Sequence, residues 1–152
     1  MTEPIVFTSH TPRFELPLLF SGQAQKEFFI NEAQLIIDAL LHLTVEGTAT
    51  VPPSEAHAGD CWIVGADAES DWAGQEDAIA VRHATGWKFI TPKHGMTAYH
   101  TPLGQRWHFN HGWQNEASPN TPSGGTTVDV EARASIESLI TSLTNIGVFA
   151  EL

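Results

Sequence analysis

The chain has 152 residues, of which 41% are apolar, and its 18 acidic residues against 7 basic ones give a net charge of −11. This length predicts one domain with attached segments, and the negative field disfavours a nucleic-acid partner and a membrane partner. The single cysteine, Cys61, leaves no internal disulfide, and Met1–Val6 lacks the basic and apolar stretches of a secretory signal. We therefore expect folding in the cytoplasm, with stability supplied by packing or by oligomerisation.

Residues 1–20 contain three prolines and end in an apolar run. A segment of this composition is typical of an extended arm that lies on another surface. We expect the arm to dock on a partner protein or a neighbouring subunit, and the residues that would anchor it are Leu16, Leu18, Leu19 and Phe20. The alternative is that the arm covers the sheet of its own chain.

Residues 21–45 predict an association helix that runs from about residue 22 to residue 43, with Ser21 as its N-cap. Its main apolar positions follow steps of 4, 3, 4 and 3 residues: Phe29, Ala33, Ile36, Leu40 and Leu43. The residues that widen this stripe are Ile30, Ile37 and Leu41, and those that line the opposite side are Glu27, Asn31, Gln34 and Asp38. Two interpretations stay open: the helix packs on its own β domain, or it forms a short bundle with other copies. Alternating steps with Ile or Leu at the seam favour trimers or higher states.

Residues 46–113 predict a small antiparallel sheet or barrel-like module, because short β-type segments alternate with turns that contain Gly or Pro. The expected strands are 61–64, 78–83, 87–90, 96–100 and 105–110. Turns this frequent leave no room for the long crossovers that parallel strands need. The predicted fold class is therefore α+β, with an N-terminal and a C-terminal amphipathic helix flanking the module.

Residues 114–127 have many hydroxyl residues and no apolar periodicity, the composition of a flexible linker. Residues 128–152 predict a second helix, capped by Asp129 and ended by Gly147 at the C′ position. Its apolar positions repeat the steps of the first helix: Ala132, Ile136, Leu139, Leu143 and Ile146. The residues expected to mediate oligomerisation are Phe29, Ala33, Ile36, Leu40, Ile136, Leu139, Leu143 and Ile146.

All five tryptophans lie between Asp60 and Trp113. Alternation along the strands indicates mainly structural roles for Trp62, Trp87 and Trp107, whereas Trp72 lies in a polar loop and Trp113 follows a turn. An exposed indole beside polar groups suits a sugar, because the ring packs on C–H groups while its neighbours bond the hydroxyls. The residues of this hypothetical carbohydrate site are Trp72, Asp71, Trp113 and Asn115. The alternative is that these rings cover the core or lie between subunits.

We expect no metal, no cofactor and no enzymatic activity. A calcium-loop pattern in the acidic loop fails, because Trp72 stands where glycine is required and Ala78 where glutamate is required. His108 and His111 are three residues apart, so they point to opposite faces of a strand. Cys61 lies at the start of a strand rather than in a polar cleft, and no nucleophile motif is present.

Several motifs together resemble a known group of proteins. They are Leu16–Glu27 (LPLLFSGQAQKE), Asn31-Glu32-Ala33, Asp38-Ala39-Leu40, Pro52-Pro53, Gly59–Gly65 (GDCWIVG), Trp72-Ala73-Gly74, Ile79-Ala80 and Gly86–Phe89 (GWKF). They are similar to an uncharacterised family encoded among phage structural genes and gene-transfer-agent clusters of alphaproteobacteria. The likeness covers roughly residues 12–113 and is most specific in the first helix and in GDCWIVG.

That resemblance implies a virion component, part of a tail fibre or a head spike that attaches the particle to the surface polysaccharide of a recipient cell. The expected partners are further copies of the chain, with a trimer favoured, and other virion proteins such as a capsid or a longer spike protein. The family supplies no catalytic residues. Two alternatives stay open: a carbohydrate-binding module that contacts the capsule directly through exposed tryptophan, and a capsule-depolymerising hydrolase.

Overall fold

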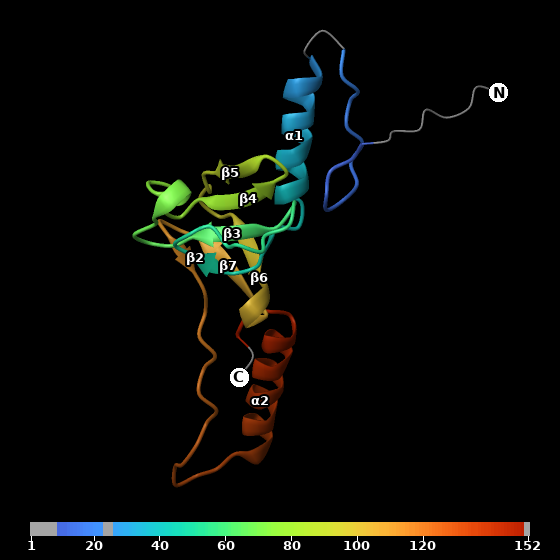
Figure 1. Cartoon of the computed structure of the whole chain (residues 1–152). Coiled ribbons are helices and arrows are strands. Elements are labelled where there is room, and N and C mark those ends of the chain that lie inside the picture. Colours follow the sequence, from blue (N-terminus) through green and yellow to red (C-terminus); the bar gives the residue numbers. More distant parts are fainter. Residues whose placement is uncertain (1–8, 23–25, 151–152) are drawn as a thin grey trace, which may run out of the picture.

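The computed structural model describes residues 9–22 and 26–150 (Figure 1). Its helices and strands are α1 (Lys26–Leu40), β1 (Thr44–Val45), β2 (Thr48–Ala49), β3 (Cys61–Val64), β4 (Ile79–His83), β5 (Gly86–Ile90), β6 (Thr97–His100), β7 (Gln105–Phe109), β8 (Trp113–Gln114) and α2 (Val130–Asn145). Two 3-10 turns, η1 (Ser70–Trp72) and η2 (Thr101–Leu103), lie in loops. The five predicted strands correspond to β3–β7 within one residue at each end. The α+β class, with a helix towards each end of the chain, is confirmed.

The strands form two four-stranded sheets, in the orders β1-β6-β7-β8 and β2-β3-β4-β5. The structure differs from the prediction in that both sheets are mixed and neither closes into a barrel, since β1 pairs parallel with β6 and β2 parallel with β3. Residues 50–60 supply the crossover between β2 and β3, which is long enough for parallel pairing. Gly47, at a φ of +150°, separates β1 from β2 and lets two consecutive strands join different sheets.

The main core lies where the two sheets meet the C-terminal end of α1. Its buried residues are Ala39, Leu43, Val45, Cys61, Ile63, Ile79, Val81 and Ala98. The helix ends at Leu40 rather than at the predicted residue 43, because His42 adopts a φ of +50° and Leu43 then turns into the core. The predicted cap at Ser21 would act on residues 23–25, which lie outside the described residues.

The opposite face of the β2–β5 sheet carries a second, aromatic cluster. Trp62 from β3 and Trp87 and Phe89 from β5 share this face, as strand alternation predicts. Trp72, from η1, covers them, with its ring centroid 5.0 Å from that of Trp87 and 6.5 Å from that of Phe89, both edge to face. We call Trp62, Trp72, Trp87 and Phe89 the aromatic cluster.

Residues 9–20 are fastened to α1 of their own chain. The buried carboxylate of Asp38 accepts hydrogen bonds from the Thr11 hydroxyl at 2.6 Å and from the backbone N–H groups of Arg13 and Phe14 at 3.0 and 2.7 Å. Asn31, two turns earlier on the same side of the helix, bonds both the N–H and the C=O of Leu19.

This attachment is close to the alternative in which the arm covers its own chain, although the arm lies on α1 rather than on the sheet; docking on another subunit stays a prediction. The side of α1 that carries Asn31 and Asp38 binds backbone groups of the arm instead of water, and Leu16, Leu18 and Leu19 are half-buried in the same chain. Polar side chains on a helix can hold a neighbouring backbone as readily as they can face solvent, so the polar side of α1 did not predict this contact. Of the four predicted anchoring residues, Phe20 is exposed. The arm is part of the fold.

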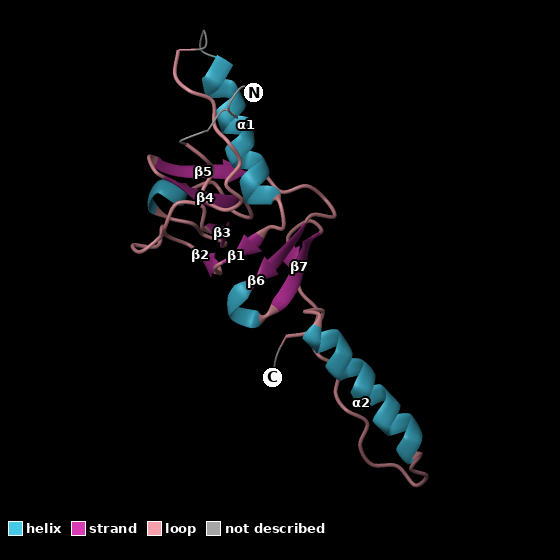
Figure 2. Cartoon of the chain, turned by 90° about the vertical axis from the view of Figure 1, so that its right-hand side faces the viewer, coloured by secondary structure: helices cyan, strands magenta, loops and turns pink. Residues whose placement is uncertain are grey.

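The second helix, α2, projects from the side of the β module away from α1 (Figures 1 and 2). The Asp129 carboxylate accepts the N–H of Ala132, which confirms the predicted N-cap. Gly147 has a φ of +74°, and the hydrogen bonds Gly147 N–H to Thr144 C=O and Val148 N–H to Leu143 C=O form a Schellman motif, which confirms the predicted C′ position.

The end of α2 is fixed to β7. The backbone N–H of Arg106 donates to the C=O of Gly147, and the side chain of the fully buried Gln105 donates to the carbonyls of Val148 and Glu116. Residues 115–129, most of the predicted linker, run extended beside α2 (Figure 1), where Arg133 donates to the carbonyls of Pro122 and Gly124. None of the described helices is long and apolar enough to cross a lipid bilayer.

Candidate functional site

Trp72 is not the exposed sugar platform that its polar loop predicted. Its side chain is 0% exposed and packs in the aromatic cluster. The prediction treated the loop as a solvated segment, whereas η1 turns the ring inwards over Val64, Ala78 and Ala80 of the sheet. Burial of this large apolar surface outweighs the polar character of the residues around it.

The other three residues of the predicted carbohydrate site do not join Trp72. Trp113 packs against the main core, on the opposite face of the β2–β5 sheet, and its indole N–H donates to the C=O of Asp77 at 2.9 Å. The Asn115 amide donates to the Gln105 side chain at 3.1 Å, and Asp71 is exposed in η1. Trp113 and Asn115 therefore fix a loop and a strand within the fold, and none of the three residues packs with Trp72 in the aromatic cluster.

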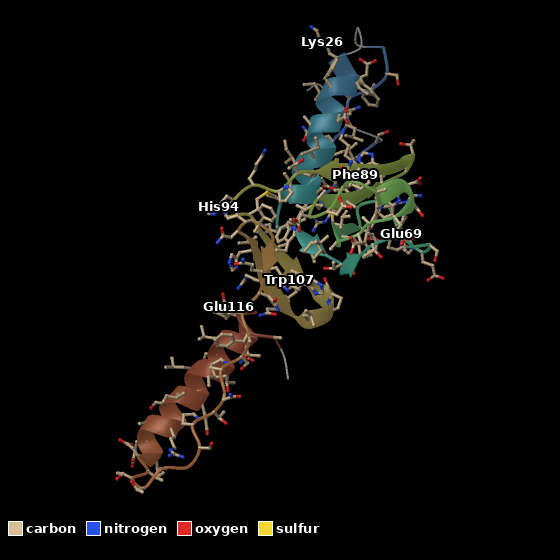
Figure 3. All side chains as sticks on the ribbon, turned by 90° about the vertical axis from the view of Figure 1, so that its left-hand side faces the viewer. Lys26, Glu69, Phe89, His94, Trp107 and Glu116 are labelled. Atoms are coloured by element: carbon tan, nitrogen blue, oxygen red, sulfur yellow. The ribbon has the colours of Figure 1, made fainter. Side chains whose placement is uncertain are left out.

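Side chains of the metal-ligating types lie mostly apart from one another in the described residues. Among residues 9–22 and 26–150 there is no group of three or more His, Cys, Asp or Glu side chains that could hold a metal ion. His94 lies near His111, with ring centroids 5.8 Å apart, whereas the acidic loop of Glu69 lies at the other edge of the β module (Figure 3). Burial raises the pKa of the Cys61 thiol to about 12, which removes its nucleophilic form at neutral pH.

A groove of about 570 Å³ lies between the N-terminal half of α1 and the β4–β5 hairpin. The helix contributes Phe28, Glu32 and Leu35 to its walls, and the hairpin contributes His83, Thr85, Trp87 and Lys88, among others. Glu32 and Lys88 form an ion pair across it. We call this the α1–hairpin groove. The sequence predicted a mainly structural role for Trp87 and did not indicate a groove beside the β4–β5 hairpin.

One face of α1 exposes a row of apolar side chains. The exposed fraction is 73% for Phe29 and 51% for Ile37, and Ile30, Ala33 and Leu41 are exposed beside them. The predicted seam residues Ile36 and Leu40 are half-buried, and Leu40 packs against the main core. We call Phe29, Ile30, Ala33, Ile37 and Leu41 the α1 apolar face.

The second helix has no buried residue in its 16 positions. The predicted ridge is exposed at Ile136, Leu139 and Ile146, where the fraction for Leu139 is 62%, while Leu143 is half-buried. The extended segment beside α2 lies along the flank that carries Arg133, Glu137 and Ile140. The ridge itself, Ala132, Ile136, Leu139, Leu143 and Ile146, is the α2 apolar ridge.

A comparison with known protein families matches the β module and most of α1. Residues 30–114 match the model of a protein family described as "Protein of unknown function (DUF2793)". The matched region contains most of α1 and all eight strands, but not the arm or α2. A search of curated proteins finds none that matches the chain. Because the family match spans more than half of the 152 residues, the chain belongs to the DUF2793 family.

Proposed function

We propose that the chain is an oligomeric structural subunit of a phage-like particle or gene transfer agent, where it forms or anchors a head spike or tail fibre that attaches the particle to surface polysaccharide. The observation that carries this proposal is the exposure of the α1 apolar face and the α2 apolar ridge on opposite sides of one β module. The particle setting is supported only by the resemblance of the sequence motifs to a family encoded among phage structural genes and gene-transfer-agent clusters.

The exposure of α2, in which no residue is buried, is the strongest reason to expect a partner. A helix of 16 residues is marginal in water without tertiary packing, and α2 contains five Ser or Thr residues, which lower helix propensity. Covering an exposed Leu or Ile side chain contributes roughly 1.5–3 kcal/mol. The apolar area that a partner could bury is therefore large enough to decide whether α2 is a stable helix; it comes from Ile136, Leu139 and Ile146.

The spacing of the ridge favours copies of the same chain as the partner. Steps of 4, 3, 4 and 3 residues keep one seam facing an identical helix, and Ile or Leu at both seam positions favours three or more strands. Glu131 and Glu137 lie outside this seam. The seam therefore brings no carboxylates together, although each chain carries a net charge of −11.

Incorporation into particles tests the proposal. In cells that make the particles, we expect a tagged chain to co-purify with them through a density gradient. The substitution Leu139→Glu, which places a charge in the ridge, is expected to reduce incorporation at least about tenfold, since burying an unpaired carboxylate costs more than the 1.4 kcal/mol that tenfold represents.

Ala134→Glu is the matched control, because it adds the same charge to an exposed position of α2 outside the ridge. It should be incorporated like the wild type. Mass spectrometry of the purified particles measures both variants. Wild-type chain absent from the particles, or Leu139→Glu incorporated normally, would refute the virion role of the ridge.

A further inference from the structure

The strand β5 forms an edge of its sheet that is longer than the other sheet edges. The edge strands are β1, β8, β2 and β5, and the first three have two residues each, whereas β5 has five. Short edge strands protect a protein from unwanted strand pairing, because they offer few free backbone groups. The length of β5, at the margin of the β module beside α1 (Figure 1), leaves an edge that can accept another strand.

The hydrogen bonds of β4 show which way the backbone of β5 points. Arg82 of β4 bonds towards β3, since its N–H donates to Asp60 and its C=O accepts from Gly59, both at 2.8 Å. Successive residues of a strand direct their backbone groups to opposite sides. Val81 therefore bonds towards β5, where its partner is Lys88. The backbone groups of Lys88 are thus used within the sheet.

The residues on either side of Lys88 have the opposite direction. The N–H and C=O groups of Trp87 and Phe89 point away from β4, because the backbone alternates along β5. These groups have no hydrogen-bond partner among residues 9–22 and 26–150. The edge of β5 therefore presents two donors and two acceptors at the spacing of a paired strand.

The α1–hairpin groove lies beside this edge. Its volume is about 570 Å³, and the wall formed by α1 includes the apolar residues Phe28 and Leu35. Trp87 also lines the groove, but its ring packs with Trp62 and Trp72 on the opposite face of the sheet, so its backbone is the part that borders the groove. A chain segment in the groove would lie between α1 and the free backbone groups of β5.

We propose that the groove binds an extended segment of another protein, which adds to β5 as a further strand. The segment bonds to the N–H and C=O groups of Trp87 and Phe89, and its alternate side chains select it from other segments. The side chain opposite Lys88 lies on the α1 side, because Lys88 itself pairs with Glu32 of α1. Phe28 lines that side, and an apolar residue suits it.

Charge selects the segment further. Two carboxylates, Glu27 and Glu32, line the groove with one lysine, Lys88, and the chain carries −11, so basic flanks attract and acidic flanks repel. A second copy of β5 is a poorer occupant. Antiparallel pairing of Trp87 with Phe89 of the other copy would place Lys88 opposite the same lysine, and like charges in this position are destabilising.

The test uses the full-length chain and an array of synthetic peptides with an apolar centre of Val, Ile and Phe residues. One set is flanked by lysines and the matched set by glutamates, and we expect the lysine-flanked set to bind more tightly. The tightest peptide is then added in solution, and amide exchange is followed by NMR. The amides of Trp87 and Phe89 should exchange at least about tenfold more slowly in the complex. Those of Gly86, Lys88 and Ile90, which bond to β4, should change little.

Phe28→Ala should weaken peptide binding about tenfold, which corresponds to about 1.4 kcal/mol. Phe14→Ala is the control, because it makes the same truncation at an exposed residue of the arm that does not line the groove. It should bind like the wild type. Light scattering of each variant reports assembly separately, since the edge of β5 and the α2 apolar ridge involve different residues.

Four results would overturn strand addition at β5. They are no binding of lysine-flanked peptides, equal binding of glutamate-flanked peptides, a complex in which the amides of Trp87 and Phe89 stay unprotected, and equal effects of Phe28→Ala and Phe14→Ala. Protection of the Trp87 and Phe89 amides without added peptide would instead assign the edge to a second copy, and would also overturn the proposal.

Discussion

Trp72→Ala is expected to lower the free energy of unfolding by about 3–5 kcal/mol, the range for truncating a buried tryptophan. The ring is 0% exposed and contacts both Trp87 and Phe89, so its removal leaves a cavity under η1 and frees Trp87 to move. Most domains of this size are stable by only 5–15 kcal/mol in total. The variant should therefore be largely unfolded at temperatures where the wild type is folded.

Trp72→Phe distinguishes loss of packing from loss of a hydrogen bond. The indole N–H of Trp72 has no hydrogen-bond partner among the described residues, so phenylalanine loses only ring volume there. We expect this variant to lose less than half as much stability as Trp72→Ala in urea unfolding followed by circular dichroism. A Trp72→Ala protein as stable as the wild type would contradict the assignment of Trp72 to the core. Trp72 would then again be a candidate for ligand binding.

Asp38→Ala is expected to cost about 3 kcal/mol and to release the arm from α1. The carboxylate accepts three hydrogen bonds while it is 1% exposed, and a buried donor left without its acceptor costs about 1–3 kcal/mol. Alanine leaves the Thr11 hydroxyl and the N–H groups of Arg13 and Phe14 without their acceptor. These groups then regain hydrogen bonds only by moving into water.

Hydrogen exchange measures this release residue by residue. The amides of Arg13 and Phe14 should exchange at least about tenfold faster in Asp38→Ala. The exchange rates of the β4 amides should change only as far as the global stability changes. Asp38→Asn is the control, because it has nearly the same shape and keeps one acceptor oxygen, and it should have an intermediate effect. Unchanged protection of the arm in Asp38→Ala would show that other contacts hold residues 9–20.

Local periodicity was enough to predict most elements of the fold. The strands 61–64 and 105–110 follow from alternation and flanking turns, and Asp129 and Gly147 follow from the chemistry of helix caps. The shared face of Trp62, Trp87 and Phe89 also follows from the two-residue period of a strand. These features depend on neighbours in the sequence, which is why they could be read from it.

The features that escaped prediction depend on contacts between distant segments. Thr44–Val45 and Thr48–Ala49 are too short to show a strand period, and their parallel partners lie elsewhere in the chain. Asp38 looked like a solvated helix residue because nothing local marks it as the acceptor for residues 11–14. The choice between a sugar contact and a cover on the core stayed open for Trp72 for the same reason, since its loop is polar and only the sheet beneath it is apolar; the structure shows the cover on the core.

The mass of the wild-type chain in solution tests the central claim, that other copies of the chain cover the α1 apolar face and the α2 apolar ridge. Light scattering during gel filtration at micromolar concentration gives that mass directly. We expect a multiple of the 16.6 kDa chain mass, with three copies favoured by the seam residues. A monomer of 16.6 kDa in which the amides of α2 are fully protected from hydrogen exchange would contradict this claim. In such a monomer α2 would be stable with its apolar ridge in water.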